Sequence, residues 1–295
     1  GGAGAAVSEL QGAPEPADYD KFWAAQRARL AEVPVKATLM EVPSSRTNFV
    51  AFDVRVECPG GKPVSGYLTV PKIASPKSLK AFLGFRGYGV SSGELIFMGD
   101  KICFSINAHG IDNGQEQSYY RKLAEGELRN YGFSKAENAK PETSYFNGMF
   151  LRVLRALDYV KTRPEWNGKD LIVSGGSQGG LQALVGAAFD KDVTSCDVSI
   201  PWFCDLQGSS LGRIKASWLP EFADGLAYYD GANLGKRVRC PVKIVAGLGD
   251  RLSPPATVMV LYNNLSCSKR IEMFQGMIHQ PFPPHGAQSF VLRVN

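Results

Sequence analysis

The segment Leu171-Ile-Val-Ser-Gly-Gly-Ser-Gln-Gly-Gly180 decides how this chain folds and where its chemistry lies. The apolar run at its start is typical of a buried strand, and the glycine-rich turn after it predicts a helix that opens at Gln178. A strand, a sharp turn carrying a serine and a helix together form a nucleophile elbow, in which glycines relieve the strained backbone. We therefore expect Ser177 to project from the sheet, with the Gln178 N–H pointing to where an oxyanion forms. A structural serine in an ordinary turn is the alternative.

A nucleophilic serine needs a histidine as its base and an acid that orients this histidine. Asp250 follows a strand expected near 241–246, and His279 follows a strand expected near 269–274. The chain order Ser, Asp, His is that of the α/β hydrolases, in which all three residues meet at the carboxyl edge of a parallel sheet. We therefore expect Ser177, Asp250 and His279 to form a catalytic triad.

Other histidines and aspartates fit these two roles less well. The chain has three histidines; His109 precedes the serine, against the chain order, and His285 lies in a proline-rich tail. We expect both to be structural or surface residues. Three aspartates are weaker candidates for the acid, because none ends a strand just before the histidine's strand: Asp205, Asp224 and Asp230.

The second oxyanion donor is expected in a loop that follows an earlier strand. A strand is expected near 81–86, and Arg86-Gly-Tyr-Gly89 forms a glycine-flanked turn at its end. We expect the Tyr88 N–H to face the Gln178 N–H across the site. A plain glycine-rich turn without a catalytic role is the alternative.

The rest of the chain predicts one α/β-hydrolase domain over 17–295, preceded by a lead-in or linker over 1–16. We expect a mostly parallel sheet with helices on both faces, opened by an N-terminal helix and an antiparallel hairpin. The helices are expected at 18–33 and 144–162, the hairpin strands at 50–56 and 64–70, and further strands near 81–86, 101–107, 170–174, 195–200, 241–246 and 269–274.

The polar segment 113–143 is longer than an ordinary connection between elements. Segments of this type form lids or partner surfaces. The alternative is a solvated excursion with a short helix near 121–129.

Composition excludes several function classes. The chain has 295 residues, of which 44% are hydrophobic and 21% charged, enough for one large core or two small domains. No run approaches the about 20 apolar residues of a membrane span. The net charge of +5 comes from scattered residues, so we expect no nucleic-acid partner. Six cysteines without a Cys-x-x-Cys pair favour neither a disulfide scaffold nor a metal site, and the chemistry needs no cofactor. We expect a soluble protein of the cytoplasm, or of the periplasm or exterior if a signal peptide was removed.

Several motifs together resemble the acetyl xylan esterase and cephalosporin-C deacetylase family, carbohydrate esterase family seven. The similarity runs from about Asp18 to His279. Besides the serine motif and the segment Arg163–Asp170 before it, it rests on Tyr19-Asp-Lys-Phe-Trp23, Pro201-Trp-Phe-Cys-Asp205, Tyr229-Asp-Gly-Ala-Asn-Leu234, Cys240-Pro241, Gly249-Asp250 and Pro254-Pro-Ala-Thr257.

The resemblance implies the same site residues that the pattern predicts: Ser177, Asp250 and His279 as triad, with Tyr88 and Gln178 as oxyanion donors. It also implies a homo-oligomer, and it implies that the segment 113–143 helps to build both the entrance of the site and the oligomer. Three family motifs are altered in this chain: His-Gly-Tyr is Arg86-Gly-Tyr88, Arg-Gly-Gln is His109-Gly-Ile111, and His-Glu is His279-Gln280. We therefore expect a divergent member with a changed supporting shell.

These observations predict a serine carboxylesterase that removes O-acetyl groups from acetylated xylo-oligosaccharides or related small acetyl esters through an acyl-enzyme. The acetyl preference comes from the resemblance. Trp202 and Phe203, just past the strand near 195–200, are candidates for the wall of a small acyl pocket, with ordinary core positions as the alternative. Two other functions are a serine peptidase of the prolyl-oligopeptidase type, for whose gating domain the chain has no room, and a non-catalytic carbohydrate-binding relative.

Overall fold

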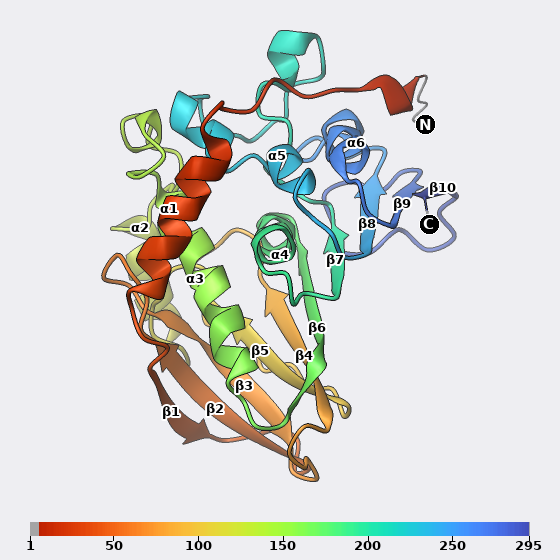
Figure 1. Cartoon of the computed structure of the whole chain (residues 1–295). Coiled ribbons are helices and arrows are strands. Elements are labelled where there is room, and N and C mark those ends of the chain that lie inside the picture. Colours follow the sequence, from red (N-terminus) through yellow and green to blue (C-terminus); the bar gives the residue numbers. More distant parts are fainter. Residues whose placement is uncertain (1–5, 295) are drawn as a thin grey trace.

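The computed structural model describes residues 6–294, and within this range the strands form one ten-stranded sheet (Figure 1). The strands are β1 (Ala37–Val42), β2 (Phe49–Val56), β3 (Val64–Pro71), β4 (Leu79–Phe85), β5 (Lys101–Ile106), β6 (Trp166–Gly176), β7 (Ser195–Ser199), β8 (Val242–Gly247), β9 (Lys269–Phe274) and β10 (Ser289–Val294). The α-helices are α1 (Tyr19–Ala31), α2 (Gln117–Glu125), α3 (Tyr145–Lys161), α4 (Gln178–Phe189), α5 (Gly231–Gly235) and α6 (Pro255–Asn264). No described helix combines the length and the apolar character needed to cross a bilayer.

The strand order is β1-β2-β3-β5-β4-β6-β7-β8-β9-β10. The six strands from β5 to β9 along this order run parallel to one another, and the pairs at both ends of the sheet are antiparallel. The chain moves outward from β4 to β5 and then returns to place β6 on the other side of β4. Ligands of open α/β sheets bind at such a reversal of strand order, and both the Ser177 turn and the Tyr88 loop lie there.

The antiparallel hairpin expected at the start of the domain is confirmed. Strands β2 and β3 pair over their whole length, from Phe49 opposite Pro71 to Val56 opposite Val64. The two outer strands were not expected from the sequence. Side chains of β1 and β10 are mostly exposed on both faces, so neither strand carries the alternating pattern that marks a half-buried strand.

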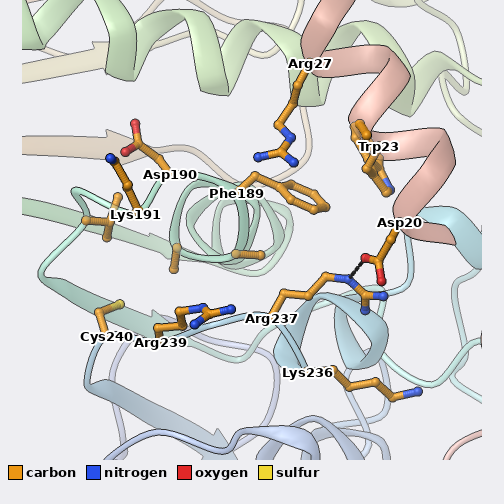
Figure 2. Close-up of a pocket in the computed structure, with 14 residues that line it drawn as sticks. Asp20, Trp23, Arg27, Phe189, Asp190, Lys191, Lys236, Arg237, Arg239 and Cys240 are labelled. Atoms are coloured by element: carbon orange, nitrogen blue, oxygen red, sulfur yellow. Dashed lines mark hydrogen bonds and ion pairs between the residues drawn. The ribbon is translucent and has the colours of Figure 1, made fainter.

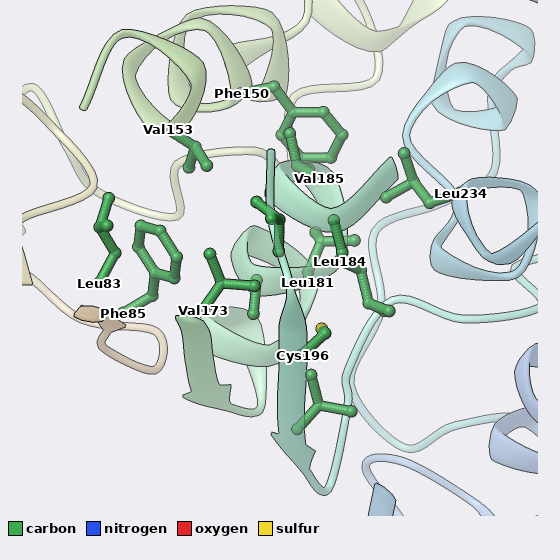
Figure 3. Packing of buried hydrophobic residues seen from close by; sticks show 14 of the residues in the cluster. Leu83, Phe85, Phe150, Val153, Val173, Leu181, Leu184, Val185, Cys196 and Leu234 are labelled. Atoms are coloured by element: carbon green, nitrogen blue, oxygen red, sulfur yellow. The ribbon is translucent and has the colours of Figure 1, made fainter. Parts of the chain in front are cut away.

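The core lies between the sheet and helices α3, α4, α5 and α6. Figure 3 shows how side chains from β4, β6 and β7 meet those of α3, α4 and α5. Val173 of β6 and Val153 of α3 are fully buried, and a Cβ at Gly186 of α4 would lie 3.3 Å from a methyl group of Val173. Helix α4 therefore packs directly on the strand that carries the serine, which fixes the direction of the turn between them.

Helix α1 packs on the outside of this layer, alongside α3 (Figure 1). Its buried residues include Phe22 and Trp23, as its amphipathic pattern predicts. The Trp23 ring stacks on Phe150 of α3, with ring centroids 5.5 Å apart, and meets Tyr229 edge-on. Of the lead-in expected at 1–16, residues 1–5 lie outside the described residues. The part after them contacts α6, where the Asn263 amide donates hydrogen bonds to two of its carbonyl groups.

Candidate active site

Ser177 stands at the turn between β6 and α4. Its backbone has φ 56° and ψ −121°, a conformation that non-glycine residues rarely adopt and that costs free energy. A Cβ at Gly175 would lie 2.3 Å from the carbonyl oxygen of Gly179, and a Cβ at Gly179 would lie 2.2 Å from that of Phe85. Both positions therefore need glycine, because strand and helix pass each other at backbone contact distance. The serine is held at the carboxyl edge of the sheet.

The structure brings Ser177, His279 and Asp250 together in one line of hydrogen bonds. His279 Nε2 lies 2.8 Å from Ser177 Oγ, and His279 Nδ1 lies 2.8 Å from Asp250 Oδ2. A carboxylate only accepts hydrogen bonds, so Nδ1 carries the proton and Nε2 is left to accept from the serine hydroxyl. This is the tautomer that a histidine needs to act as a base toward serine.

Asp250 is held in place by the loop that follows β8. Its side chain is fully buried, and Oδ1 accepts hydrogen bonds from the backbone N–H groups of Leu252 and Ser253 at 2.8 and 2.9 Å. The histidine loop lies against the same segment, because the Gly249 N–H donates to the Met277 carbonyl at 2.9 Å. One carboxylate oxygen is thus used to fix the loop, and the other is directed at His279.

Tyr88 and Gln178, the two residues expected as oxyanion donors, both lie beside Ser177. Gln178 is the first residue of α4, so its N–H has no partner inside the helix. The Tyr88 loop lies directly opposite, since a Cβ at Gly87 would be 3.9 Å from the Ser177 Cβ. Among the described residues, no hydrogen bond uses the N–H of either Tyr88 or Gln178. Both donors are therefore free for a ligand beside the serine.

The serine opens into a cleft of about 640 Å³. Its walls are formed by Arg86, Gly87, Tyr88, Glu94, Gly176, Ser199, Ile200, Trp218, Leu252, His279 and Pro281. Arg86 and Glu94 form an ion pair at the rim. The cleft is thus apolar near the serine and charged at its edge, which suits a ligand with a small apolar group and a polar body.

Trp202 and Phe203 do not line this cleft, in contrast to the expectation for an acyl pocket. Both are fully buried. Trp202 lies behind Trp218, stacking on it at 5.0 Å between ring centroids and donating a hydrogen bond to its carbonyl oxygen at 2.9 Å. Phe203 packs on Phe146 of α3. The wall residue is Trp218, which lies in an irregular segment without a sequence signal for its place.

In the described part of the chain, the other aspartates and histidines considered for the acid and the base form no hydrogen bond with Ser177 or His279. Asp230 caps α5 and accepts backbone hydrogen bonds from Asp205 and Leu206, and burial raises the pKa of its carboxyl to about 6. Asp205 itself pairs with Arg213, and Asp224 begins a short 3₁₀ turn. His285 is exposed in the tail, whereas His109 is buried beside the Tyr88 loop.

Comparisons with known proteins identify the family of this chain. The family model for acetyl xylan esterase (AXE1) matches residues 8–211 and 220–293. The chain belongs to the acetyl xylan esterase family. This is a family of carboxylic ester hydrolases, and the resemblance inferred from the motifs is confirmed.

The individual relatives share less than a third of their residues with this chain. It is 27% identical over 270 residues to the acetyl esterase Axe7A of Xylanibacter ruminicola, covering 86% of this chain and 61% of the relative. The chain thus spans about three fifths of that protein's length. Among solved structures, it resembles an acetyl xylan esterase from a Paenibacillus species, with a TM-score of 0.78, 22% identity and 95% of each chain covered.

A second acetyl xylan esterase structure, from a Thermoanaerobacterium species, matches with a TM-score of 0.72 and 21% identity, covering 95% of this chain and 94% of the other. These solved structures confirm the α/β-hydrolase fold with its mostly parallel sheet.

A second pocket, of about 700 Å³, lies away from the serine (Figure 2). It is lined by the end of α4 and by Cys240, which precedes β8, whereas Asp250 follows β8. It therefore lies at the opposite edge of the sheet from the serine. Arg237 there is bound by Asp20 and stacks on Tyr19 at 4.0 Å, so this pocket contains structural ion pairs and no nucleophile with a base. Among residues 6–294, no group of three or more metal-binding side chains occurs.

Proposed function

We propose that the protein is a serine esterase that releases acetate from acetylated xylo-oligosaccharides or related small acetyl esters. The observation that carries the proposal is the continuous line of hydrogen bonds from Asp250 through His279 to Ser177, on a chain that belongs to the acetyl xylan esterase family. Two free N–H groups beside the serine add the electrostatic part of an esterase site.

The first half of the reaction forms an acyl-enzyme. Ser177 Oγ attacks the acetyl carbonyl carbon while His279 Nε2 takes the hydroxyl proton, and the carbonyl oxygen becomes an oxyanion. The N–H groups of Tyr88 and Gln178 donate to this oxyanion. Asp250 stays ionised and stabilises the imidazolium at Nδ1. The intermediate then collapses, the C–O bond to the sugar breaks, and His279 gives its proton to the leaving alcohol.

The second half returns the enzyme to its starting state. A water molecule takes the place of the alcohol, gives a proton to His279 Nε2 and attacks the acetyl carbon bound to Ser177. The same two N–H groups hold the second oxyanion. Collapse releases acetic acid, and His279 returns the proton to Ser177 Oγ. No step needs a metal or an organic cofactor.

The cleft supports an acetylated sugar as substrate. Tyr88 and Trp218 stand at right angles, with ring centroids 4.4 Å apart, and together with Ile200 and Leu252 they enclose the space beside the serine. A small acyl group fits this apolar floor, and the Arg86–Glu94 pair at the rim offers donors and acceptors to sugar hydroxyls.

The test is acetate release from acetylated xylo-oligosaccharides, with p-nitrophenyl acetate measured in parallel. We expect both substrates to be hydrolysed by the wild type, and both rates to fall at least about 10³-fold in Ser177→Ala. Activity on the nitrophenyl ester alone would reject xylan fragments as the substrate. Faster cleavage of peptide amides than of esters would favour the serine peptidase. A folded protein whose Ser177 does not react with fluorophosphonates would favour the non-catalytic binding protein.

We further propose that the chain forms a homo-oligomer, as the family resemblance implies. The edge strand β1 supports this proposal, because it exposes Leu39 and Met40 to solvent at 40% and 63%. Exposed apolar side chains on an edge strand favour association. Light scattering coupled to size-exclusion chromatography measures the mass directly, and a monomer at all concentrations would contradict the proposal.

A further inference from the structure

The loop that carries the Tyr88 N–H is held by side chains from outside it. Gly89, the next residue, has φ +147°, in a segment without regular secondary structure. Its N–H donates to the Tyr131 hydroxyl at 2.9 Å, and its carbonyl oxygen lies 2.9 Å from His109 Nε2. The two peptide groups that follow Tyr88 are thus each fixed by one side chain.

The Tyr88 side chain is fixed by the same neighbour. Its ring stacks on that of Tyr131, with centroids 4.0 Å apart and an angle of 9° between the planes, and its hydroxyl donates to the Tyr131 carbonyl at 3.3 Å. The fully buried Gln178 carboxamide, on the other side of the oxyanion site, also lies near the Tyr131 hydroxyl. Tyr131 therefore contacts both residues that are proposed to supply the oxyanion donors.

His109 is set up as a donor by its own partners. A carbonyl oxygen only accepts, so Nε2 carries the proton, and Nδ1 accepts from the Tyr145 hydroxyl 2.6 Å away. The ring is only 3% exposed, and burial lowers the pKa of His109 to about 4, which keeps it neutral. Arg152 binds the neighbouring Ala108 carbonyl through two nitrogens at 3.0 and 2.6 Å, so the backbone beneath the histidine is also fixed.

The backbone around Tyr131 is shaped to present this residue. Asn130 has φ 50° and Gly132 has φ 79°, so left-handed residues flank it on both sides. A Cβ at Gly132 would lie 2.8 Å from the Phe146 ring. The segment 113–143, whose role the sequence left open between a lid and a solvated excursion, therefore turns sharply to place one buried tyrosine against the Tyr88 loop.

We propose that Tyr131 and His109 are positioning residues that clamp Gly89 and thereby aim the Tyr88 N–H at the oxyanion. This inference rests on the proposed function, in which Tyr88 is a donor. It assigns a role to His109, which stands where the resembled family has arginine, and to Tyr131 of the segment 113–143. A donor displaced by a fraction of an ångström stabilises the transition state less, while substrate binding is little affected.

The kinetic test compares four variants on p-nitrophenyl acetate. Tyr131→Phe leaves the Gly89 N–H without its acceptor, and His109→Leu removes the donor to the Gly89 carbonyl. We expect each to lower kcat by about 10- to 100-fold with KM within about twofold. His109→Gln keeps an N–H donor and should restore most of the loss. Tyr120→Phe is the matched control: Tyr120 is about as buried as Tyr131, at 5% against 6% exposed, and its hydroxyl accepts a loop N–H at 3.2 Å, from Gln115.

A second readout is independent of turnover. Backbone amide hydrogen exchange at Gly89 should be slow in the wild type and in Tyr120→Phe, and fast in Tyr131→Phe. If the wild type exchanges slowly but hydrolyses no ester, the clamp stands and the proposed function fails. If Tyr131→Phe matches Tyr120→Phe in both kcat and exchange, or if His109→Gln is as impaired as His109→Leu, the clamp is overturned.

Discussion

Each residue of the proposed triad is defined by its surroundings as much as by its chemistry. Asp250 differs from the other buried aspartates in one respect: one of its oxygens fixes its own loop, and the other meets a histidine. Asp230 is also buried, but its oxygens accept three backbone N–H groups, one of them at the start of α5. These surroundings distinguish the carboxylate that we propose as catalytic from one that holds the backbone, which the residue type alone does not do.

This difference predicts opposite effects for two matched substitutions. Asp250→Asn removes the acceptor that selects the histidine tautomer and should lower kcat by about 10³- to 10⁴-fold while the protein remains folded. Asp230→Asn should leave kcat within a few-fold and lower the free energy of unfolding by about 1 kcal/mol, because it weakens a helix cap. Steady-state kinetics and urea unfolding of both variants measure the two effects. Equal kcat losses would contradict the assignment of Asp250.

We expect the Trp218 side chain to limit the length of the acyl group that the cleft accepts. It lines the cleft beside Tyr88, and Trp218→Ala would open space next to the serine. We expect the ratio of butyrate to acetate ester hydrolysis to rise about tenfold or more, since each methylene is worth about 1–3 kcal/mol in an apolar pocket. Trp166→Ala, a tryptophan outside the cleft lining, should leave the ratio unchanged. A ratio that rises in neither variant would place the acyl group elsewhere.

At the scale of elements, the turn between β6 and α4 depends on how closely helix and strand approach. A Cβ at Gly179 would meet the carbonyl oxygens of Phe85 and Arg86 at 2.2 and 2.9 Å. Both atoms belong to the backbone at the end of β4, so the helix itself must move. Since α4 carries the Gln178 N–H and β4 leads to the Tyr88 loop, such a movement separates the two oxyanion donors.

Gly179→Ala should therefore lower both stability and activity. Overpacking typically costs about 1–3 kcal/mol, and we expect a loss of this size in the free energy of unfolding, together with a fall in kcat. Gly99→Ala is the control, because a Cβ there meets nothing within 4 Å. Urea unfolding and kinetics of the two alanine variants provide the comparison. A fully active and stable Gly179→Ala protein would show that the contact is loose.

The central elements were predictable because their residues carry strong local patterns. Short apolar runs predict the strands near 170–174, 241–246 and 269–274, and glycines predict the Ser177 turn. These elements position the three residues of the proposed triad. The role of Tyr131 was not predictable, because no local pattern links it to Gly89, 42 positions away. The place of Trp218 in the cleft wall was not predictable for the same reason. Trp202 was expected in the acyl pocket but lies in the core, because the sequence alone does not tell which way a bulky side chain after a strand points.

At the scale of the whole molecule, burial of titratable groups links stability to pH. Burial lowers the pKa of His109 to about 4, against about 6.5 for an exposed histidine. The unfolded chain therefore binds more protons between these values, so His109 makes the fold less stable as pH falls from about 6.5 to 4. The raised pKa of Asp230, about 6, acts in the opposite direction, because there the folded state binds the proton more tightly.

Comparison of the wild type with His109→Gln isolates the histidine contribution. The groups whose charges act on His109 include Arg152, Glu127 and Lys62, and they are the same in both proteins. We expect the wild type to lose up to about 3 kcal/mol relative to the variant between pH 7 and 4, measured by urea unfolding at several pH values. A difference that does not change with pH would mean that His109 titrates normally in the fold.

The proposed mechanism requires that Ser177 carries the acetyl group between the two halves of the reaction. Rapid acid quenching during turnover of p-nitrophenyl acetate, followed by peptide mapping by mass spectrometry, tests it most directly. We expect a peptide heavier by one acetyl group, with the group on Ser177 in the wild type and absent from Ser177→Ala, which should also have lost turnover. An acetyl group on another residue, or undiminished turnover in Ser177→Ala, would contradict it.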